Sequence, residues 1–197
     1  MCGRYQFSLE QPTLRAIWEQ ARQRFPNADM EAGEIFPTGL VPVLLNVDGA
    51  LGPQPLRWGF PCADGKGTVI NVRAETAASK PMFRNSLLHR RCVVPTSGFF
   101  EWSHDRAHNK YSFRQAGSGV LYLAGLYRDF GGERRFVILT RPANESIADV
   151  HDRMPVILQE DQLDSWVYHG RQTEYLLTQA APQLTRESED YEQQSLF

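Results

Sequence analysis

Short runs of β-forming residues follow one another along the middle of this chain, and they limit its fold more than any other feature. Aliphatic and aromatic residues dominate the runs, and glycine or proline separates them, which is the pattern of strands joined by turns. The predicted strands are Val41–Val47, Gln54–Trp58, Val69–Ala74, Arg91–Val94, Phe99–Trp102, Tyr111–Arg114, Leu121–Tyr127 and Arg135–Thr140. That many strands need a large curved sheet.

Helices are predicted before and after this run of strands and once within it. After Ser8, an N-cap candidate with Gln11 three residues on, apolar residues recur at helical spacing until Pro26 closes the helix: Leu14, Ile17, Trp18, Ala21 and Phe25. Further helices are predicted over Thr76–Leu88, interrupted by Pro81, and over Asp161–Tyr168 and Thr173–Ala181. Strand spacing is irregular and no repeat period is visible, so we predict an α+β fold.

The chain is long enough for one substantial core, since 42% of its 197 residues are hydrophobic and 22% are charged. We therefore expect a single domain over residues 1–185. The acidic segment 186–197 is typical of a solvated tail. It is expected either to be disordered or to dock through Leu196 and Phe197.

Charge and cysteine content limit the function classes. The formal net charge of −2 does not by itself indicate a nucleic-acid partner, so such binding needs a local basic face. The candidate basic cluster is Arg84, His89, Arg90 and Arg91.

The cysteines, Cys2, Cys62 and Cys92, fit neither a disulfide framework nor a zinc site, and we expect all of them to be reduced. Without an apolar run of roughly 18 residues or a secretion signal, the chain is expected to be cytoplasmic.

Cys2 becomes the first residue once the initiator methionine is removed. A free α-amine and a thiol on adjacent carbons can both add to one aldehyde carbon and close a thiazolidine ring, which an internal cysteine cannot do. The α-amine has a reference pKa of about 7.7–8.0 against about 10.4 for lysine, so far more of it is neutral and nucleophilic at pH 7. The alternative is that a small second residue merely permits removal of the methionine.

Two further segments carry polar residues in strand-like patterns. Read as a strand, residues 71–75 place Asn71, Arg73 and Glu75 on one face, where the guanidinium suits a phosphate or sugar oxygen and the amide positions a reacting group. The alternative is an exposed face with an Arg–Glu pair.

Glu101 lies inside an aromatic run, so lost solvation would raise its pKa and make it a candidate general acid or base. Alternatively, Glu101 points to solvent.

His151-Asp152-Arg153 combines a proton-exchanging imidazole with an anion-binding group at a loop-to-strand junction. The alternative is a structural turn. The other histidines, His89, His104, His108 and His169, are expected on the surface.

Trp58 and Phe60 suit either stacking on unpaired bases or packing in a core strand. The core is favoured for Trp58, and the choice between the two stays open for Phe60.

Taken together and in this order, the motifs resemble the SRAP family, the SOS-response-associated peptidase-like proteins. They are Met1-Cys2-Gly3-Arg4, Leu56-Arg57-Trp58-Gly59-Phe60, Asn71-Val72-Arg73-Ala74-Glu75-Thr76, Pro81-Met82-Phe83-Arg84, Arg91-Cys92-Val93-Val94-Pro95, Gly98-Phe99-Phe100-Glu101-Trp102 and His151-Asp152-Arg153-Met154-Pro155. The resemblance covers nearly the whole chain. The fold that it implies is a compact α+β domain with a twisted, barrel-like, mostly antiparallel β core, short flanking helices and a positively charged groove ending at Cys2.

The function implied by the resemblance is that of a sensor of abasic sites in single-stranded DNA, which protects the lesion in the DNA damage response. The α-amine of Cys2 would form a Schiff base with the ring-opened sugar aldehyde, and the thiolate would then close the thiazolidine crosslink. Glu101 would assist proton transfer, His151 would handle the sugar hydroxyl and crosslink reversal, and Asn71 would orient Cys2.

The same resemblance implies a DNA surface and a cellular setting. Arg4, Arg73 and Arg153 would lie near phosphates, Trp58 and Phe60 would stack on bases, and Arg84 would extend the electrostatic track. Neither metal nor cofactor is expected, the protein is expected to be a monomer that removes its own Met1, and it would associate with the nucleoid when bound to DNA. Whether it also cleaves the strand as a lyase stays open.

One segment departs from the family pattern, and two other functions compete. Many members carry an Asn-x-Ala-Pro type segment where this chain has Glu34-Ile35-Phe36-Pro37-Thr38. The competing functions are a thiol peptidase that uses Cys2, His151 and Glu101, and a noncovalent reader of modified single-stranded DNA. An internal thiol would serve a peptidase equally well, so that function leaves the N-terminal placement of Cys2 unexplained.

Overall fold

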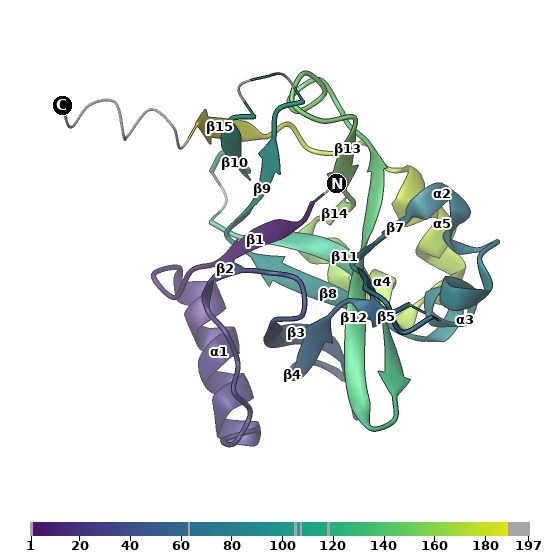
Figure 1. Cartoon of the computed structure of the whole chain (residues 1–197). Coiled ribbons are helices and arrows are strands. Elements are labelled where there is room, and N and C mark those ends of the chain that lie inside the picture. The colour runs from purple at the N-terminus through teal and green to yellow at the C-terminus, as the bar shows by residue number, and fades with distance from the viewer. Residues whose placement is uncertain (1, 63, 105, 107, 118, 189–197) are drawn as a thin grey trace.

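The computed structural model describes residues 2–62, 64–104, 106, 108–117 and 119–188. Its centre is a closed barrel (Figure 1) in which the strands follow the order β12, β4, β3, β8, β11 and back to β12. The bounds of these strands are β3 Leu40–Val47, β4 Ala50–Trp58, β8 Arg91–Thr96, β11 Leu121–Phe130 and β12 Glu133–Pro142. Neighbours are antiparallel except for β4 and β12, which run parallel. The predicted α+β fold with a barrel-like, mostly antiparallel core is confirmed.

A second sheet lies against one end of the barrel and is antiparallel throughout. Its order is β15 (Thr185–Ser188), β10 (Lys110–Arg114), β9 (Gly98–Trp102), β1 (Arg4–Phe7) and β2 (Gly33–Ile35). Only Ser97 separates β8 of the barrel from β9 of this sheet. The Thr96 hydroxyl fixes this junction, since its oxygen lies 2.6 Å from the carbonyl oxygens of both Gln6 and Gly98.

Short strands extend the barrel toward the second sheet. β7 (Asn71–Arg73) continues parallel to β12 beyond β4, β13 (Arg153–Pro155) pairs with the end of β12, and β14 (Ile157–Leu158) pairs with β11. β5 (Phe60–Pro61) and β6 (Thr68–Val69) form a separate pair. The strand predicted over Val69–Ala74 is therefore wrong as one unit, because it is divided between β6 and β7 and gives way to a helix at Ala74.

The helices lie outside the sheets, and α1 packs against β3 and β4. Their bounds are α1 Pro12–Arg24, α2 Ala74–Ala77, α3 Pro81–His89, α4 Leu163–Tyr168 and α5 Thr173–Thr178, with 3₁₀ turns at Glu160–Gln162 and Gly170–Gln172.

Three helix boundaries differ from the prediction. The N-cap of α1 is Gln11 rather than Ser8, because the Gln11 side chain accepts a hydrogen bond from the Thr13 amide, and Pro12 opens the helix. Pro81 does not interrupt a helix but begins α3, since proline suits the first helical position. The last helix ends at Thr178, short of Ala181.

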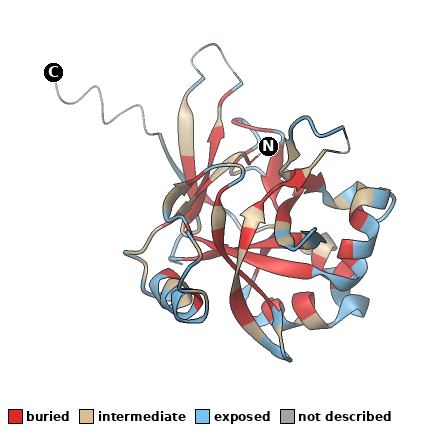
Figure 2. Cartoon of the chain, turned by 60° about the horizontal axis from the view of Figure 1, so that its bottom comes forward, coloured by how far each residue is buried: buried red, intermediate tan, exposed pale blue. Residues whose placement is uncertain are grey.

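The core fills the barrel and continues beneath the second sheet, and Figure 2 shows buried residues along strands of both. Trp58 has no exposed surface, its ring lies 5.1 Å from that of Tyr5, and its indole nitrogen donates to the Ile70 carbonyl at 3.0 Å. Gly59 has φ of +107°, and a Cβ there would lie 2.0 Å from the Thr68 side chain. A glycine is therefore required between Trp58 and Phe60.

The C-terminal part of the described chain is held in the second sheet. β15 contains Arg186, Glu187 and Ser188, the first residues of the predicted acidic tail, and pairs with β10. Arg186 also forms an ion pair with Asp149 at 2.6 Å. The remainder of the predicted tail, residues 189–197, lies outside the described residues. Among the described helices, none is both long and apolar enough to cross a bilayer.

Candidate functional site

Cys2 lies just before β1, with its side chain almost fully buried. Its thiol donates to the Arg4 carbonyl at 3.5 Å, and the side-chain amide of Asn71 donates to the Cys2 carbonyl at 2.7 Å. Asn71 is brought there by β7, which is paired in register with β12. Two residues far apart in sequence are thus joined where the barrel meets the second sheet.

Glu101 comes to the same place from β9, the neighbour of β1. Arg4 pairs with Phe100, so the antiparallel register sets Glu101 beside the residues that precede β1. Glu101 is only 3% exposed, and the alternative in which it points to solvent is wrong. Burial raises its pKa from 4.5 to about 7, although the positive charge of the amino terminus acts in the opposite direction.

The electrostatics of Cys2 follow from those of Glu101. Burial, together with the nearby Glu101 carboxylate, raises the pKa of the Cys2 thiol well above its usual value. The thiol is therefore protonated at neutral pH in this environment. A reaction that uses the sulfur as a nucleophile needs a base to remove that proton, and Glu101 titrates in the suitable range.

His151 lies in the turn before β13 and is 8% exposed. Its Nδ1 lies 2.9 Å from the Arg153 amide nitrogen and also 2.9 Å from an Asp152 carboxylate oxygen, contacts that favour opposite protonation states of that nitrogen. The backbone amide can only donate, whereas the Asp152 side chain is 79% exposed and can move, so Nδ1 is the acceptor and the imidazole is neutral. Burial lowers the pKa of His151, which agrees with this assignment.

His104 was expected on the surface, and its side chain is indeed exposed, yet its ring lies 4.7 Å from that of His151. No pattern in the sequence links the two histidines, because they approach each other only through the fold. Each of His104, His151 and Asp152 offers one atom that could bind a metal ion, and these three atoms lie within 4.8 Å of one another. Among the described residues, no other group of three or more histidine, cysteine, aspartate or glutamate side chains does so. The Arg153 amide already occupies Nδ1 of His151, so that nitrogen is engaged.

The Arg153 guanidinium is engaged within the protein. It is buried and binds both oxygens of Glu75 at 2.8 and 2.9 Å, and it also donates to the Thr140 carbonyl at 2.7 Å. The guanidinium is thus bound to protein oxygens in this structure, and the expected phosphate contact of Arg153 stays a prediction. The hydrogen bonds from Arg153 lower the pKa of Glu75 despite some burial.

The predicted polar strand face of residues 71–75 is corrected. Glu75 belongs to α2, and its partner is Arg153 rather than Arg73. Arg73 is the N-cap of α2 and is exposed, so its guanidinium is accessible near the strand that carries Asn71.

Trp58 and Phe60 cannot provide a surface for base stacking, because both rings are fully buried. Phe60 packs against Phe83 at 5.9 Å and Phe130 at 5.1 Å between ring centres. The family-based expectation for these two residues is wrong, and the core interpretation holds for both.

An exposed aromatic surface next to Cys2 comes instead from Phe36, in the segment that departs from the family pattern, and from Trp102. Phe36 is 45% exposed, and Trp102 is partly exposed on β9. They line a shallow hollow of about 730 Å³ together with Gly3, Arg4 and Lys110. This hollow is adjacent to Cys2 along the chain.

The predicted basic cluster is divided between surface and core. Arg84 is exposed on α3, which Figure 1 shows apart from β1 and β9. Arg90 bonds to Asn85, and Arg91 is buried with its guanidinium bound to backbone carbonyls. The four residues therefore do not form one continuous basic face.

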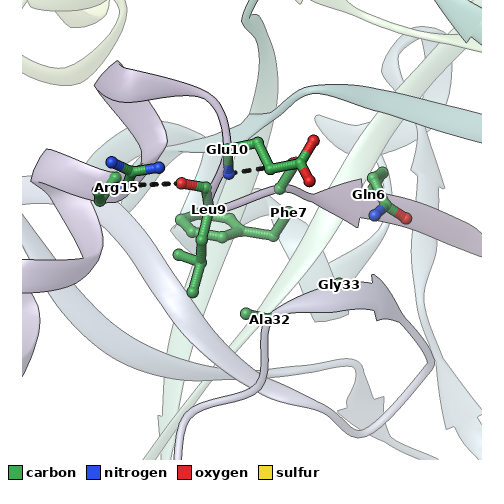
Figure 3. A pocket seen from close by; sticks show the side chains of 8 residues that line it. Gln6, Phe7, Leu9, Glu10, Arg15, Ala32 and Gly33 are labelled. Atoms are coloured by element: carbon green, nitrogen blue, oxygen red, sulfur yellow. Dashed lines mark hydrogen bonds between the residues drawn. The ribbon is translucent and has the colours of Figure 1, made fainter.

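A further hollow of about 580 Å³ lies at the other end of β1 (Figure 3), between Gln6, Phe7, Leu9 and Arg15. There the Arg15 side chain donates to the Leu9 carbonyl at 2.7 Å. A strand rises about 3.3 Å per residue, so Phe7 is about 16 Å along the strand from Cys2. This hollow is separate from the Cys2 site.

Comparisons with known proteins agree with the motifs. Residues 1–193 match the family model described as SOS response associated peptidase (SRAP). The chain is 32% identical to abasic site processing protein YoaM of Bacillus subtilis, over 100% of this chain and 92% of that protein. It is 30% identical to abasic site processing protein YedK of Escherichia coli, over 85% of this chain and 79% of that protein.

Solved structures show the same fold. A crystal structure of a protein from Bacteroides thetaiotaomicron superimposes with a TM-score of 0.78 at 21% identity, covering 98% of this chain and 94% of that one. A protein from Bordetella bronchiseptica gives 0.75 at 22% identity, over 95% and 99% of the two chains.

Proposed function

The chain belongs to the SOS response associated peptidase (SRAP) family, and we propose that it processes abasic sites in single-stranded DNA by forming a covalent crosslink through a mature N-terminal Cys2. The similar proteins from B. subtilis and E. coli are named abasic site processing proteins. The observation that carries the proposal is the group around Cys2: an amide from Asn71 on its carbonyl, a buried Glu101 with a pKa of about 7, and a neutral His151 whose pKa the charge of the amino terminus helps to lower.

The proposed reaction needs no oxidant or reductant. The α-amine of Cys2 adds to the C1′ aldehyde of the ring-opened sugar, and the resulting hydroxyl leaves as water to give an imine. The sulfur then adds to the imine carbon, and the nitrogen takes up a proton as the thiazolidine closes. One aldehyde and one aminothiol thus become one ring and one water molecule.

The residues divide the proton transfers among them. Because the thiol is protonated at neutral pH, the amine attacks first and the sulfur second. Protonated Glu101 supplies the proton for the departing hydroxyl, and its carboxylate then accepts the thiol proton. Asn71 holds the Cys2 carbonyl and so fixes the direction of both nucleophiles. His151 handles the sugar hydroxyl and contributes to reversal.

DNA contacts are assigned to the accessible groups around this site. Arg4 and Arg73 are the proposed phosphate contacts, and Phe36 and Trp102 replace Trp58 and Phe60 as the proposed stacking surface. Arg84 stays a predicted contact for a longer strand. The monomeric state and the cytoplasmic location stay predictions.

A peptidase acting on foreign chains fits the site less well. An internal thiol would serve such a peptidase equally well, so that function leaves the N-terminal placement of Cys2 unexplained, whereas the thiazolidine ring requires it. We propose that any peptide cleavage is limited to self-removal of Met1, which exposes the α-amine that the crosslink requires.

The test is the intact mass of denatured protein after incubation with single-stranded DNA that carries one abasic site. We expect a species at the summed mass of mature protein and DNA minus one water. Cys2→Ser, and a chain with one bulky residue retained before Cys2, should give no such stable species. An equally abundant, equally stable adduct from either variant would sink the thiazolidine mechanism, because neither can close the ring.

A further inference from the structure

Two cations share a single carboxylate beside the Cys2 site. Arg4 Nη1 lies 3.0 Å from one Glu34 oxygen, and Lys110 Nζ lies 3.1 Å from the other. The three side chains come from β1, β10 and β2, so the sheet itself brings them together. Glu34 lies in the segment that departs from the family pattern.

Aromatic rings fix the orientation of both cations. The Arg4 guanidinium carbon lies 4.2 Å from the centre of the Phe36 ring and 5.1 Å from that of Trp102. Lys110 Nζ lies 4.0 Å from the centre of the Phe100 ring. Since these rings attract the cations, the N–H donors of both side chains stay gathered around Glu34.

This arrangement matches what a phosphodiester would need. Guanidinium and ammonium groups bind the oxygens of phosphate and of carboxylate with the same N–H donors, so the two anions compete for one place. The Glu34 side chain is 29% exposed, and both of its partners, Arg4 and Lys110, line the hollow that also contains Phe36 and Trp102. Partial burial acts to raise the Glu34 pKa, but the hydrogen bonds and charges of Lys110 and Arg4 outweigh it and lower the pKa.

We propose that Glu34 occupies a phosphate-binding place formed by Arg4 and Lys110, and that single-stranded DNA must displace this carboxylate to reach Cys2. The inference rests on the proposed function, since it concerns how the same DNA is bound. Its consequence is that Glu34 acts against DNA binding. Displaced Glu34 becomes a solvated anion, so part of the gain from the new phosphate contacts is lost.

The experiment compares Glu34→Gln with Glu133→Gln. Glu133 also bridges two cations, with oxygens 2.6 Å from Arg57 and 2.6 Å from Arg135, but it lies in the β11–β12 hairpin away from β9. Both changes raise the net charge by one, so they alter general attraction to DNA equally. The probe is an unmodified single-stranded oligonucleotide, and fluorescence anisotropy gives its affinity for each mature full-length chain at several salt concentrations.

We expect Glu34→Gln to bind the oligonucleotide about fivefold more tightly than Glu133→Gln at low salt. A plot of the logarithm of the binding constant against the logarithm of salt concentration should also be steeper for Glu34→Gln by about 0.7, the value for one more neutralised phosphate on a single strand. Adding Lys110→Met to Glu34→Gln should abolish most of that gain. Equal affinities of the two glutamine variants would overturn the inference, as would a gain that survives Lys110→Met.

The outcomes also separate this inference from the proposed function. Equal affinities combined with normal adduct formation on abasic DNA would leave the function standing and remove only the role of Glu34. If none of the chains binds or crosslinks single-stranded DNA, the proposed function fails and this inference fails with it.

Discussion

Asn71 acts in the site through an amide that can donate, and this property can be tested by a change of one atom. Its Nδ2 donates to the Cys2 carbonyl at 2.7 Å, and its Oδ1 has no hydrogen-bond partner among the described residues. In Asn71→Asp the donor becomes an oxygen that repels the carbonyl. We expect crosslinking to slow about tenfold or more, because an unsatisfied buried contact costs about 1–3 kcal/mol, while affinity for single-stranded DNA changes little.

The matched control for this prediction is Asn144→Asp. Asn144 Nδ2 also donates to a backbone carbonyl, that of Pro182 at 2.8 Å, but it contacts none of the site residues through the described hydrogen bonds. Its replacement should lower stability without slowing adduct formation, followed as the rate of appearance of the denaturation-resistant complex. Equal rates for Asn71→Asp and the unchanged chain would remove Asn71 from the positioning of Cys2.

At the scale of elements, Arg91 ties two helices to the barrel. Arg91 lies on β8, and its buried guanidinium donates to carbonyls near the ends of α3 and α4: Leu87 at 2.8 Å, Leu88 at 2.7 Å, Val167 at 3.3 Å, and also Trp166. Carbonyls in the last turn of a helix have no partner within the helix, and a cation there also interacts favourably with the helix dipole. One side chain thus satisfies the ends of both helices.

We expect Arg91→Met to lower the free energy of unfolding by about 3 kcal/mol, since several buried carbonyls lose their donors. The control is Arg90→Met, which removes an exposed side chain with a single bond to Asn85 and should cost less than about 0.5 kcal/mol. Urea unfolding measures both values. A similar small loss in both variants would mean that water replaces the guanidinium at the helix ends.

The barrel strands could be predicted because they are runs of aliphatic and aromatic residues that glycine or proline separates. The division of the predicted strand Val69–Ala74 and the start of α2 at Ala74 could not be predicted, because the alternation of polar and apolar residues continues through residues that equally favour a helix. Cys2, Asn71, Glu101 and His151 could be named from motifs. The Arg153–Glu75 pair and the His104–His151 contact could not be predicted, since each joins residues far apart in sequence that only the complete fold brings together.

At the scale of the whole molecule, the site draws its residues from both sheets. Glu101 lies on β9 of the second sheet and Cys2 just before β1 of that sheet, whereas Asn71 and His151 come from a strand and a turn that extend the barrel. The burial that gives Glu101 its raised pKa therefore exists only in the folded chain. Folding and proton binding at Glu101 are coupled as a result.

This coupling predicts how stability depends on pH. With a pKa of about 7 in the folded chain against 4.5 when solvated, Glu101 holds more proton in the folded chain between these values. Its stabilising contribution is complete below about pH 4.5 and is lost as pH rises through 7, and the loss amounts to about 3 kcal/mol. Glu101→Gln cannot ionise, so it should gain stability relative to the unchanged chain as pH rises from 5 to 8.

Glu75→Gln is the control with the opposite sign. Hydrogen bonds from Arg153 lower the Glu75 pKa, so the Glu75 carboxylate stabilises the fold above its solvated pKa, and this contribution is lost as the pH falls through its folded pKa. Relative to the unchanged chain, Glu75→Gln should be less stable by a constant amount from pH 8 down to about pH 5, and the difference should shrink as the pH falls below about 4.5. Unfolding free energies from urea titrations across pH 5–8 measure the trend for Glu101→Gln, and titrations continued below pH 4.5 measure the one for Glu75→Gln. A constant difference between Glu101→Gln and the unchanged chain over pH 5–8 would show that Glu101 is ionised throughout, and the carboxyl group could then not serve as the acid of the proposed imine step.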